Sequence, residues 1–531
     1  MLAPLEVLNR YAPHDGTLWS ALETRVAAGS ARAFLVHRDR SWSYGAFRDD
    51  ALALARALHG RGIRRGDRVG VVARSHAGHV LLLWALSRLG AVMVPTNPEF
   101  GVAEAQYVFG NTGVSAVAVT PETAATVRAA VATRAPVPWF IGFDPVDAAD
   151  VAGLDALIAS GAKGDLPPLP AADDTCLIIF TSGSTGFPKG AMHSQRNFLL
   201  AGEANICRLG LQPDDRQLTV LPMFHVNALF YSLAGTMASG SAIIVLERFS
   251  ASTFWETAER TGATTVNVIE AIGRILKGRP RSEFRPGHGI RICYGARRDV
   301  QDCFRDEFHI PHAVTGFGMT EIPGVCCMPI GVPAKAGAMG EIGRHPDPDR
   351  AWAQCRVVDE DGNDVPDDAI GEFWVKHPIV MQGYYGKPEE TKAAFRDGWF
   401  MTGDLVRRDP DGFYTFISRK KDIIRRRGEN IAGAELDRVV GEHPAVFEAA
   451  AVPVPSDLGE DEILVAVVLR EGMTATAESI AAWCRERLAA HKVPRFVLFL
   501  DSLPHTPTHK INKLPLRNDA TLKSRAVDLG V

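Results

Sequence analysis

The chain has 531 residues, enough for several domains, and an ordinary composition of 46% hydrophobic and 23% charged residues. Its net charge of −4 argues against nucleic acid as the main partner, and no apolar run reaches the roughly 18 residues of a membrane span. Its eight cysteines contain no C-x-x-C pair and the N-terminus has no basic flank before an apolar core, so zinc frameworks, disulfides and a signal peptide are not expected. These features favour a cytoplasmic protein with reduced thiols.

Short apolar runs alternate with amphipathic stretches through most of the chain. Ser43 is a good N-cap for the first expected helix. The segment 148–174 is Pro- and Asp-rich, and its end is expected to be a surface connection into the stretch that follows residue 180. Strands and helices in alternation indicate parallel βαβ units and an α/β fold. Strands are expected at 32–37, 67–73, 91–95, 114–120, 175–180 and 241–246, and helices at 44–61 and 79–89.

The last hundred residues have a different pattern, typical of a compact α+β unit. A basic run at 419–428 precedes them, so we place a boundary between domains 1–419 and 420–531. In order, the expected elements are a helix at 434–443, strands at 449–454 and 462–469, a helix at 477–491 and a strand at 496–499.

The stretch T-S-G-S-T-G-F-P-K-G, Thr181 to Gly190, follows the expected strand at 175–180. Backbone N–H groups of a glycine-rich turn converge on phosphate oxygens, hydroxyls add donors, and Lys189 adds a charge. The spacing is not that of a P-loop, and Pro188 prevents a helix from starting at once. On composition alone, a flexible surface loop is an equally good interpretation.

The order of residues in this loop closely resembles the phosphate-loop signature of the adenylate-forming superfamily, which includes acyl-CoA synthetases, peptide-synthetase adenylation domains and luciferase. Four further stretches resemble that family's motifs in the family's order: Gly316 to Glu321, Met401 to Asp404, Ser418 to Asp422 and Pro507 to Lys513. The resemblance implies a large N-terminal domain with parallel sheets and a small, mobile α+β C-terminal domain.

The same resemblance implies a role for individual residues in binding ATP. Glu321 and Thr185 would hold Mg²⁺, Thr320 would contact the α-phosphate, and Lys510 would be the catalytic lysine. Phe317 stands where the family has a stacking tyrosine, and His509 stands where it has glycine. The implied ATP- and AMP-binding residues are Thr181, Ser182, Gly183, Ser184, Thr185, Gly186, Lys189, Gly295, Ala296, Gly316, Phe317, Gly318, Met319, Thr320, Asp404 and Arg419.

His225 lies in P-M-F-H-V-N-A, where a histidine beside apolar residues is more often a packed core residue. The P-x-F-H order resembles acyl-CoA synthetases, in which this histidine is catalytic and borders the acyl pocket. That pocket would be lined by His225, Val226, Asn227 and Gly295. Peptide-synthetase domains have Phe-Asp here, so the sequence favours simple carboxylic acids. The wider pattern most resembles the bacterial carnitine-CoA ligase-like branch, and the acid is not identified.

The basic run at 419–428 could form a nucleic-acid or membrane patch, or simply a solvated face. In the family it forms the hinge, matched by Lys421, and one wall of the CoA tunnel, matched by Gly428, with some arginines as candidate contacts for the phosphates of CoA. Lys513 is a second, weaker candidate for the catalytic lysine.

The resemblance therefore implies a ligase that activates a carboxylic acid with ATP and Mg²⁺ to an acyl-adenylate and transfers the acyl group to CoA. The alternatives are an enzyme that stops at acyl-AMP or passes the acyl group to a carrier protein or partner ligase, a luciferase-type oxygenase, and a non-catalytic binding protein. A small-molecule acid is the expected partner, and a homodimer and an acyl-carrier or partner enzyme stay open.

Overall fold

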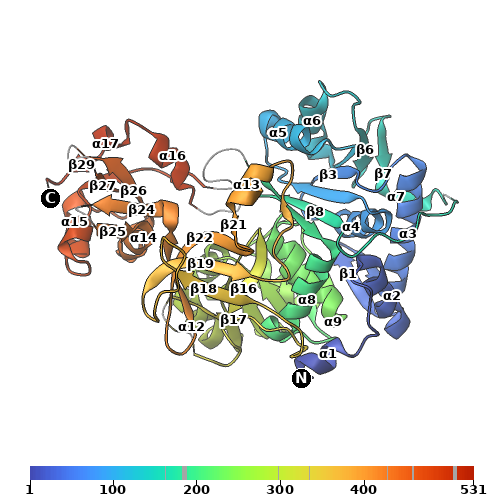
Figure 1. Ribbon diagram of the computed structural model, residues 1–531, viewed down its shortest axis with the longest axis horizontal. Coiled ribbons are helices and arrows are strands. Elements are labelled where there is room, and N and C mark those ends of the chain that lie inside the picture. Colours follow the sequence, from blue (N-terminus) through green and yellow to red (C-terminus); the bar gives the residue numbers. More distant parts are fainter. Residues whose placement is uncertain are drawn as a thin grey trace. The chain divides into compact units, whose positions relative to one another are not determined.

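The computed structural model describes residues 1–161, 163–181, 188–296, 298–333, 335, 337–426, 429–456, 460–505 and 511–530. The described chain forms two compact units (Figure 1). The first consists of Met1–Thr181, Pro188–Gln354 and Lys376–Phe400, and the second includes Cys355–Val375 and Met401–Val531. The chain therefore leaves the first unit and returns to it once before its final segment.

The first unit contains an eight-stranded sheet in the order β20-β9-β8-β4-β3-β5-β6-β7. Six of its strands run parallel, from β7 to β8, whereas β9 pairs antiparallel with β8 and β20 pairs antiparallel with β9. The strands are β3 Arg68–Val72, β4 Val92–Thr96, β5 Ala116–Val119, β6 Trp139–Gly142, β7 Val151–Gly153, β8 Thr175–Phe180, β9 Gly190–Ser194 and β20 Gly383–Tyr384.

A seven-stranded sheet in the same unit has the order β14-β13-β12-β10-β11-β1-β2 and is parallel except for β2 at its edge. Because its parallel strands end at one edge, the segments that follow β10, β12 and β13 lie close together. The strands are β1 Ala33–His37, β2 Arg40–Ser43, β10 Arg216–Thr219, β11 Ala242–Val245, β12 Thr265–Asn267, β13 Ile292–Tyr294 and β14 His312–Val314.

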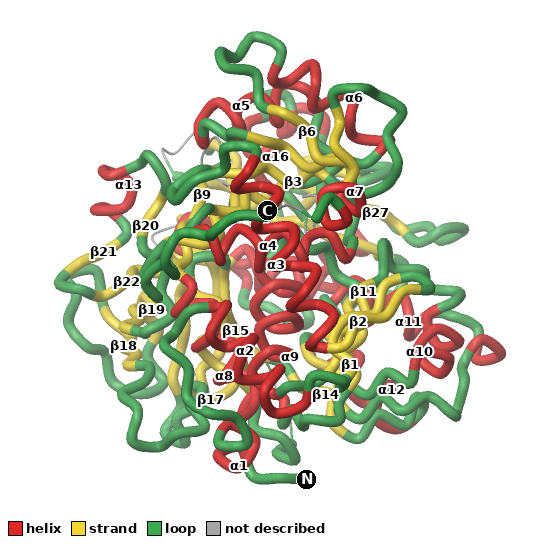
Figure 2. Tube along the Cα trace, turned by 90° about the vertical axis from the view of Figure 1, so that its right-hand side faces the viewer, coloured by secondary structure: helices red, strands yellow, loops and turns green. Residues whose placement is uncertain are grey.

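Helix α4, Ala77–Leu89, contacts strands of both sheets and is buried along almost its whole length. Figure 2 shows it among the helices packed between the sheets. The other helices are α1 Pro4–Leu8, α2 Leu18–Gly29, α3 Tyr44–Gly60, α5 Val102–Thr112, α6 Pro121–Val131, α7 Leu154–Ala159, α8 Gln195–Leu209, α9 Ala234–Ser239, α10 Phe254–Thr261, α11 Glu270–Gly278, α12 Arg298–Asp306 and α13 Pro388–Ala393, with a π-helix, η1, at Asn227–Leu233.

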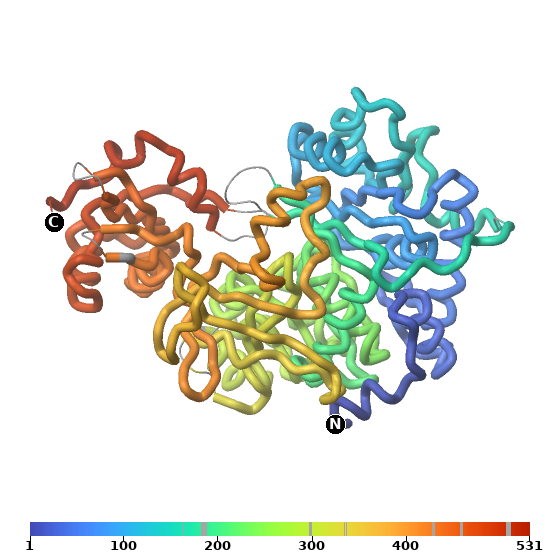
Figure 3. Tube along the Cα trace, viewed as in Figure 1, coloured from blue at the N-terminus to red at the C-terminus, as the bar shows by residue number. Residues whose placement is uncertain are grey.

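An antiparallel ladder of β15 Gly316–Met319, β16 Ile322–Cys327 and β17 Ala338–Ile342 completes the first unit's sheets. The returning residues 376–400 place β20 against β9, and Figure 3 shows this orange chain beside the green strands. At the end of this returning segment, β21 pairs antiparallel with the start of β22. The two strands are β21 Phe395–Arg396 and β22 Trp399–Arg408.

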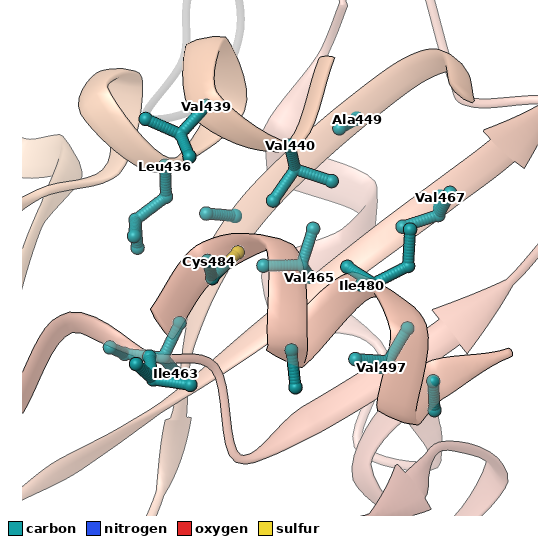
Figure 4. Close-up of a cluster of buried hydrophobic side chains, with 14 of the residues drawn as sticks. Leu436, Val439, Val440, Ala449, Ile463, Val465, Val467, Ile480, Cys484 and Val497 are labelled. Carbon is teal, nitrogen blue, oxygen red and sulfur yellow. The ribbon is translucent and has the colours of Figure 1, made fainter. Parts of the chain in front are cut away.

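The second unit has a four-stranded sheet in the order β26-β27-β28-β29, and its strands alternate residues between two cores. On β27, Ile463 and Val465 pack with α14 and α15 (Figure 4), whereas Leu464 and Ala466 pack on the face of α16 and α17. Both faces are therefore buried, as the apolar run of this strand requires. The elements are α14 Gly433–Gly441, β26 Val446–Pro455, β27 Asp461–Leu469, α15 Ala477–Arg485, β28 Phe496–Phe499, α16 Lys513–Asn518, α17 Leu522–Arg525 and β29 Val527–Asp528.

The remaining strands of the second unit precede this sheet in the chain. They are β18 Gln354–Val358, β19 Ile370–Lys376, the rest of β22, β23 Tyr414–Arg419, β24 Ile423–Arg426 and β25 Glu429–Ala432, with a short 3₁₀ turn, η3, at Lys420–Asp422. The predicted boundary between residues 419 and 420 falls between β23 and η3, and it remains a prediction, because compactness alone does not show where a chain pivots.

The fold class predicted from the sequence is confirmed, and each expected strand and helix has a counterpart. The N-cap at Ser43 is also present, with its hydroxyl accepting from the Ala46 amide at 3.2 Å. One detail differs, because the expected helix at 477–491 ends at Arg485. The segment 148–174 contains β7 and α7 near its start, and β8 is followed by the antiparallel strand β9.

All eight cysteines are free thiols, and six of them are buried. Among the helices of the described residues, none combines the length and apolarity needed to cross a membrane.

We predict that Ile463→Ala lowers the free energy of unfolding of the second unit by about 2–5 kcal/mol, because it leaves a cavity in a fully buried cluster. Ile370→Ala is the matched control, since the Ile370 side chain in the same unit is 55% exposed. Urea unfolding of both variants measures the difference. Equal destabilisation by the two changes would contradict the assignment of this core.

Candidate active site

The glycine-rich stretch connects two antiparallel strands of the first unit. Phe180 at the end of β8 lies opposite Gly190 at the start of β9, and the Thr181 amide donates to the Lys189 carbonyl at 2.9 Å. These contacts hold the two ends of the predicted phosphate loop together. Ser182, Gly183, Ser184, Thr185 and Gly186 lie outside the described residues.

Thr320 and Glu321 form the turn between β15 and β16, in which Met319 lies opposite Ile322. The Glu321 side chain is only 7% exposed. A carboxylate with so little contact to water needs hydrogen-bond donors or a cation nearby. A two-residue turn offers few donors of its own, so the partners must come from elsewhere in the chain.

Tyr384 of β20 supplies one of these donors. Its buried hydroxyl donates to Glu321 Oε1 at 2.7 Å, and burial together with the Glu321 charge raises the pKa of the phenol, so it stays protonated. The Lys189 ammonium lies 4.9 Å from the centre of the Tyr384 ring. Tyr384 therefore links the lysine of the phosphate loop to the predicted Mg²⁺ ligand.

The donor set at Glu321 fits a magnesium ion. Glu321 Oε2 accepts no hydrogen bond from the described residues, which leaves one carboxylate oxygen to act as a ligand. Magnesium prefers oxygen ligands and is usually held by one or two carboxylates, with water and substrate phosphates filling the other positions. Within the described part of the chain, no cluster of three or more metal-binding side chains competes with this assignment.

The turn is also held through its main chain. His193 of β9 donates from Nε2 to the Thr320 carbonyl at 2.8 Å, and the Met381 amide donates to the Glu321 carbonyl at 2.8 Å. Burial lowers the pKa of His193 to about 4, so the ring is neutral near pH 7 and Nε2 keeps the proton that it donates. Both carbonyls of the turn are therefore fixed by residues outside the hairpin.

Three predicted glycines lie where a side chain would not fit. Gly295 follows β13 with φ +94°, and a Cβ there would overlap the Val268 carbonyl oxygen. A Cβ at Gly316 would lie 2.7 Å from the Tyr294 hydroxyl, and one at Gly318 would overlap the Tyr231 hydroxyl. These positions require glycine because other groups approach the backbone closely. Ala296, beside Gly295, is fully buried.

His225, Val226 and Asn227 are half-buried and lie at the start of the π-helix η1. The helix contacts β10, β12 and β16, and Ser232 within it accepts a hydrogen bond from Asn267 at 3.0 Å. The first unit thus brings the predicted acyl-pocket segment next to β12 and to β16, the strand that follows Glu321. π-Helical turns are often found at functional sites.

In the second unit, the predicted ribose-binding residues are paired across two strands. Asp404 on β22 lies opposite Arg419 on β23, and Arg419 Nε forms an ion pair with Asp404 Oδ1 at 3.1 Å. Asp404 is 1% exposed, and its amide donates to the Thr402 hydroxyl, which in turn donates to the Phe373 carbonyl. The M-T-G-D stretch is therefore rigidly held by its own side chains.

The predicted hinge is docked against the C-terminal helix α16. Arg517 donates to the Lys421 carbonyl at 2.8 Å and forms an ion pair with Asp422 at 3.1 Å. Burial lowers the pKa of the Lys421 ammonium. Gly428 lies outside the described residues; on either side of it, Arg426 and Glu429 are opposite each other in a hairpin.

Arg426 of the basic run lies in the interior of the second unit. It is 1% exposed, and its Nε forms an ion pair with Glu462 Oε2 at 2.7 Å. The catalytic-lysine candidate Lys510 lies outside the described residues; His505 and Ile511, on either side of that stretch, form an antiparallel bridge. Lys513, the weaker candidate, is ion-paired with Asp437 at 2.5 Å.

The structure thus groups the predicted residues into a phosphate and magnesium part on the first unit and a ribose pair on the second. Sequence reasoning missed Tyr384 and His193. Neither belongs to a recognised motif, and their partners are remote in the chain, 63 positions away for Tyr384 and 127 for His193.

Two protein-family profiles match the chain. A profile described as AMP-binding enzyme matches residues 22–385, which is more than half of the chain, and one described as AMP-binding enzyme C-terminal domain matches residues 435–510.

The chain belongs to the AMP-binding enzyme family.

The relatives of this AMP-binding enzyme match along nearly the whole chain. A sulfoacetate–CoA ligase from Cupriavidus necator is 34% identical, covering 95% of this chain and 98% of its own. A feruloyl-CoA synthase from Amycolatopsis is 33% identical with 91% and 94% covered, and a crotonobetaine/carnitine–CoA ligase from Proteus mirabilis is 27% identical with 90% and 93% covered. The ATP-bound MatB of Rhodopseudomonas palustris superposes with a TM-score of 0.85 at 25% identity, covering 96% of this chain and 100% of that one.

These matches confirm the predicted family and the fold class. They also confirm the enzyme class predicted from the sequence, an AMP-forming acid–thiol ligase that uses ATP, Mg²⁺ and CoA. The chain is similar to a carnitine–CoA ligase, as predicted, and it is also similar to other CoA ligases.

We predict that Tyr384→Phe lowers the rate of acid-dependent ATP–pyrophosphate exchange by roughly 10- to 100-fold and raises the Mg²⁺ concentration needed for half-maximal rate, because Glu321 loses the donor that orients it. The ring beside Lys189 remains. Tyr385→Phe is the matched control, since the structure gives the Tyr385 hydroxyl no hydrogen bond with any described residue. An unchanged Mg²⁺ requirement in Tyr384→Phe would refute this role for Tyr384.

Proposed function

We propose that this AMP-binding enzyme joins a carboxylic acid to CoA in two steps, with the residues predicted from its sequence in the roles given below. The observation that carries the proposal is the linked arrangement of Lys189, Tyr384 and Glu321. It places a cation and a carboxylate around one tyrosine on three separate segments of the first unit. Such a pair suits a polyphosphate with its metal ion.

In the first step, an oxygen of the acid attacks the α-phosphorus of ATP, the bond to the β-phosphate bridging oxygen breaks, and pyrophosphate leaves. Lys189 and the loop from Thr181 to Gly186 hold the leaving phosphates, Thr320 contacts the α-phosphate, and Lys510 places its charge where negative charge gathers. Glu321 and Thr185 would hold Mg²⁺, which would neutralise phosphate charge when bound. Positioning and charge neutralisation supply most of the catalysis in such a transfer.

Adenosine is held by residues that are common to every acid. The adenine ring stacks on Phe317 and is lined by Gly295, Ala296, Gly316, Gly318 and Met319. Asp404 accepts hydrogen bonds from the ribose hydroxyls, with Arg419 beside it, because a carboxylate offers two acceptor oxygens. These contacts bind ground state and transition state alike, so they set affinity for ATP and do not select the acid.

In the second step, the thiol of CoA attacks the acyl carbon and AMP leaves with the bonding electrons. His225 borders the reacting carboxyl group, and Val226 and Asn227 line the acyl pocket. Lys421 is the hinge about which the C-terminal domain 420–531 turns relative to domain 1–419, and Gly428 gives the pantetheine arm a path. We place the enzyme in the cytoplasm, where its free cysteines stay reduced.

The relatives' acids differ in size and charge, so their names do not transfer one acid to this chain. A homodimer and an acyl-carrier or partner enzyme remain predictions. The purified protein should release pyrophosphate only when an acid is present, and mass spectrometry should detect the acyl-CoA thioester when CoA is added. Pyrophosphate release without thioester, for every accepted acid, would favour an enzyme that stops at acyl-AMP.

We predict that Lys510→Ala reduces acid-dependent pyrophosphate exchange by roughly 100-fold or more, because the transition state loses a charged donor. Lys513→Ala should keep the rate within about tenfold, since the Lys513 ammonium is already ion-paired with Asp437. Thermal unfolding of both variants checks their folding. The reverse result would show that Lys513 is the catalytic lysine.

We predict that Lys421→Pro forms acyl-AMP but makes thioester slowly, because proline fixes φ near −65° at the residue that has to change conformation between the two steps. Lys421→Ala should be mild, since a hinge requires backbone freedom and no particular charge. Single-turnover measurement of acyl-AMP and thioester separates the two steps. If Lys421→Pro makes both products at the normal rate, Lys421 is not the hinge.

A further inference from the structure

Arg208 lies in the last turn of α8, and it is a buried arginine that is only 5% exposed. Its one side-chain hydrogen bond to a described residue runs from Nη1 to Asn205 Oδ1 at 3.0 Å, and its buried Nε has no partner. No described carboxylate forms an ion pair with it. An uncompensated charge in the interior costs far more free energy than a neutral polar group.

Two other buried arginines show how this chain usually compensates such a charge. Arg25, 3% exposed, donates to the carbonyls of Met237 and Ala238 and to the Thr24 hydroxyl, and its guanidinium lies 4.0 Å over the Tyr11 ring. Arg426 is paired with Glu462. In the described chain, Arg208 differs from both, because it has neither a carboxylate nor a set of carbonyls.

The groups around Arg208 are polar but neutral. Its guanidinium lies 5.4 Å from the Tyr231 ring, which packs on Tyr294 at 5.2 Å. Burial raises the pKa of both phenols, and burial raises the pKa of the Cys327 thiol to about 12, so all three groups keep their protons near pH 7. Among the described residues, these neighbours therefore supply Arg208 with hydroxyl donors and one aromatic face, and no carboxylate forms an ion pair with it.

This cluster of Arg208, Tyr231 and Tyr294 lies directly against the segments that carry the proposed acyl pocket. A Cβ at Gly324 of β16, where φ is +97°, would overlap the Arg208 Nη1 atom, and a Cβ at Gly318 would overlap the Tyr231 hydroxyl. Tyr231 lies on η1 one π-turn after Asn227, and Tyr294 immediately precedes Gly295. The cluster therefore lies beside the segments that carry Asn227 and Gly295 of the proposed acyl pocket.

We infer that Arg208 binds a second anionic group of the acid substrate, at the end remote from the carboxylate that is activated. The substrates are then carboxylic acids with a further carboxylate or sulfonate, and Tyr231 and Tyr294 add hydroxyl donors to that group. This inference rests on the proposed function. A guanidinium suits the task because it stays charged and presents several donors in one plane.

The inference makes a specific statement about selectivity. An acid without the second anion leaves the Arg208 charge buried and unpaired, and sites built for a polar group reject analogues that lack it. The value of kcat/KM for a dianionic acid should therefore exceed that for a monoanionic acid of equal length by about 100-fold or more.

The test compares matched acids in ATP–pyrophosphate exchange with the full chain. Suitable pairs are succinate with butyrate, glutarate with pentanoate, and sulfoacetate with propionate. In Arg208→Met, which keeps length and removes charge, the preference for the dianionic member of the accepted pair should fall at least tenfold, and Arg208→Lys should restore part of it. Arg25→Met is the matched control; it should lower thermal stability without changing the ratio between paired acids.

The outcomes separate the inference from the proposed function. No exchange with any acid, in a protein that is folded by circular dichroism, would overturn the proposed function. Exchange with monoanionic acids at equal or greater kcat/KM would overturn the inference alone. If Arg208→Met does not fold, the ratio measured for the unaltered protein still decides, because a ratio near one contradicts a buried anion-binding arginine.

Discussion

A buried carboxylate on a two-residue turn is the feature on which the candidate site depends. Glu321 is nearly closed off from water, and its turn has few donors for it. The fold provides Tyr384 for one carboxylate oxygen, and His193 and Met381 for the two carbonyls of the turn. The other carboxylate oxygen is left for a metal ion, so the geometry is set before any ligand binds.

The chain's return at residues 376–400 provides much of this support. Strand β20 adds to the edge of β9, and that single pairing positions both Tyr384 and the Met381 amide next to the Thr320–Glu321 turn. Because β9 also carries His193 and begins one residue after Lys189, the base of the proposed phosphate loop and the proposed metal-binding turn share one framework. The paired antiparallel edge is thus part of the site, and not only a way to cover a sheet edge.

The sequence predicted what local pattern encodes. Alternating strands and helices gave the fold class, and contiguous motifs located Thr320, Glu321, Asp404 and Arg419, the last two of which are indeed paired. It made no assignment for the residues that follow the loop, where the structure has the antiparallel strand β9 and then α8 from Gln195. Tyr384, His193 and Arg208 were missed because their roles come from contacts between distant segments, which leave no periodicity or spacing in the chain.

The residues proposed to bind ATP with its metal ion and the residues proposed to bind the acid come from different kinds of structural element. The residues proposed to bind groups common to every reaction lie in contiguous turns and hairpins, such as Thr320–Glu321 and the M-T-G-D stretch. The residues proposed to meet the acid are single side chains of helices, Arg208 on α8 and Tyr231 on η1, and they lie against glycines that leave room for them. A substitution at these helical positions alters what lies beside the acyl pocket without disturbing the turn that holds Glu321. The same framework can therefore keep its chemistry while its acid changes, as the range of acids named among its relatives illustrates.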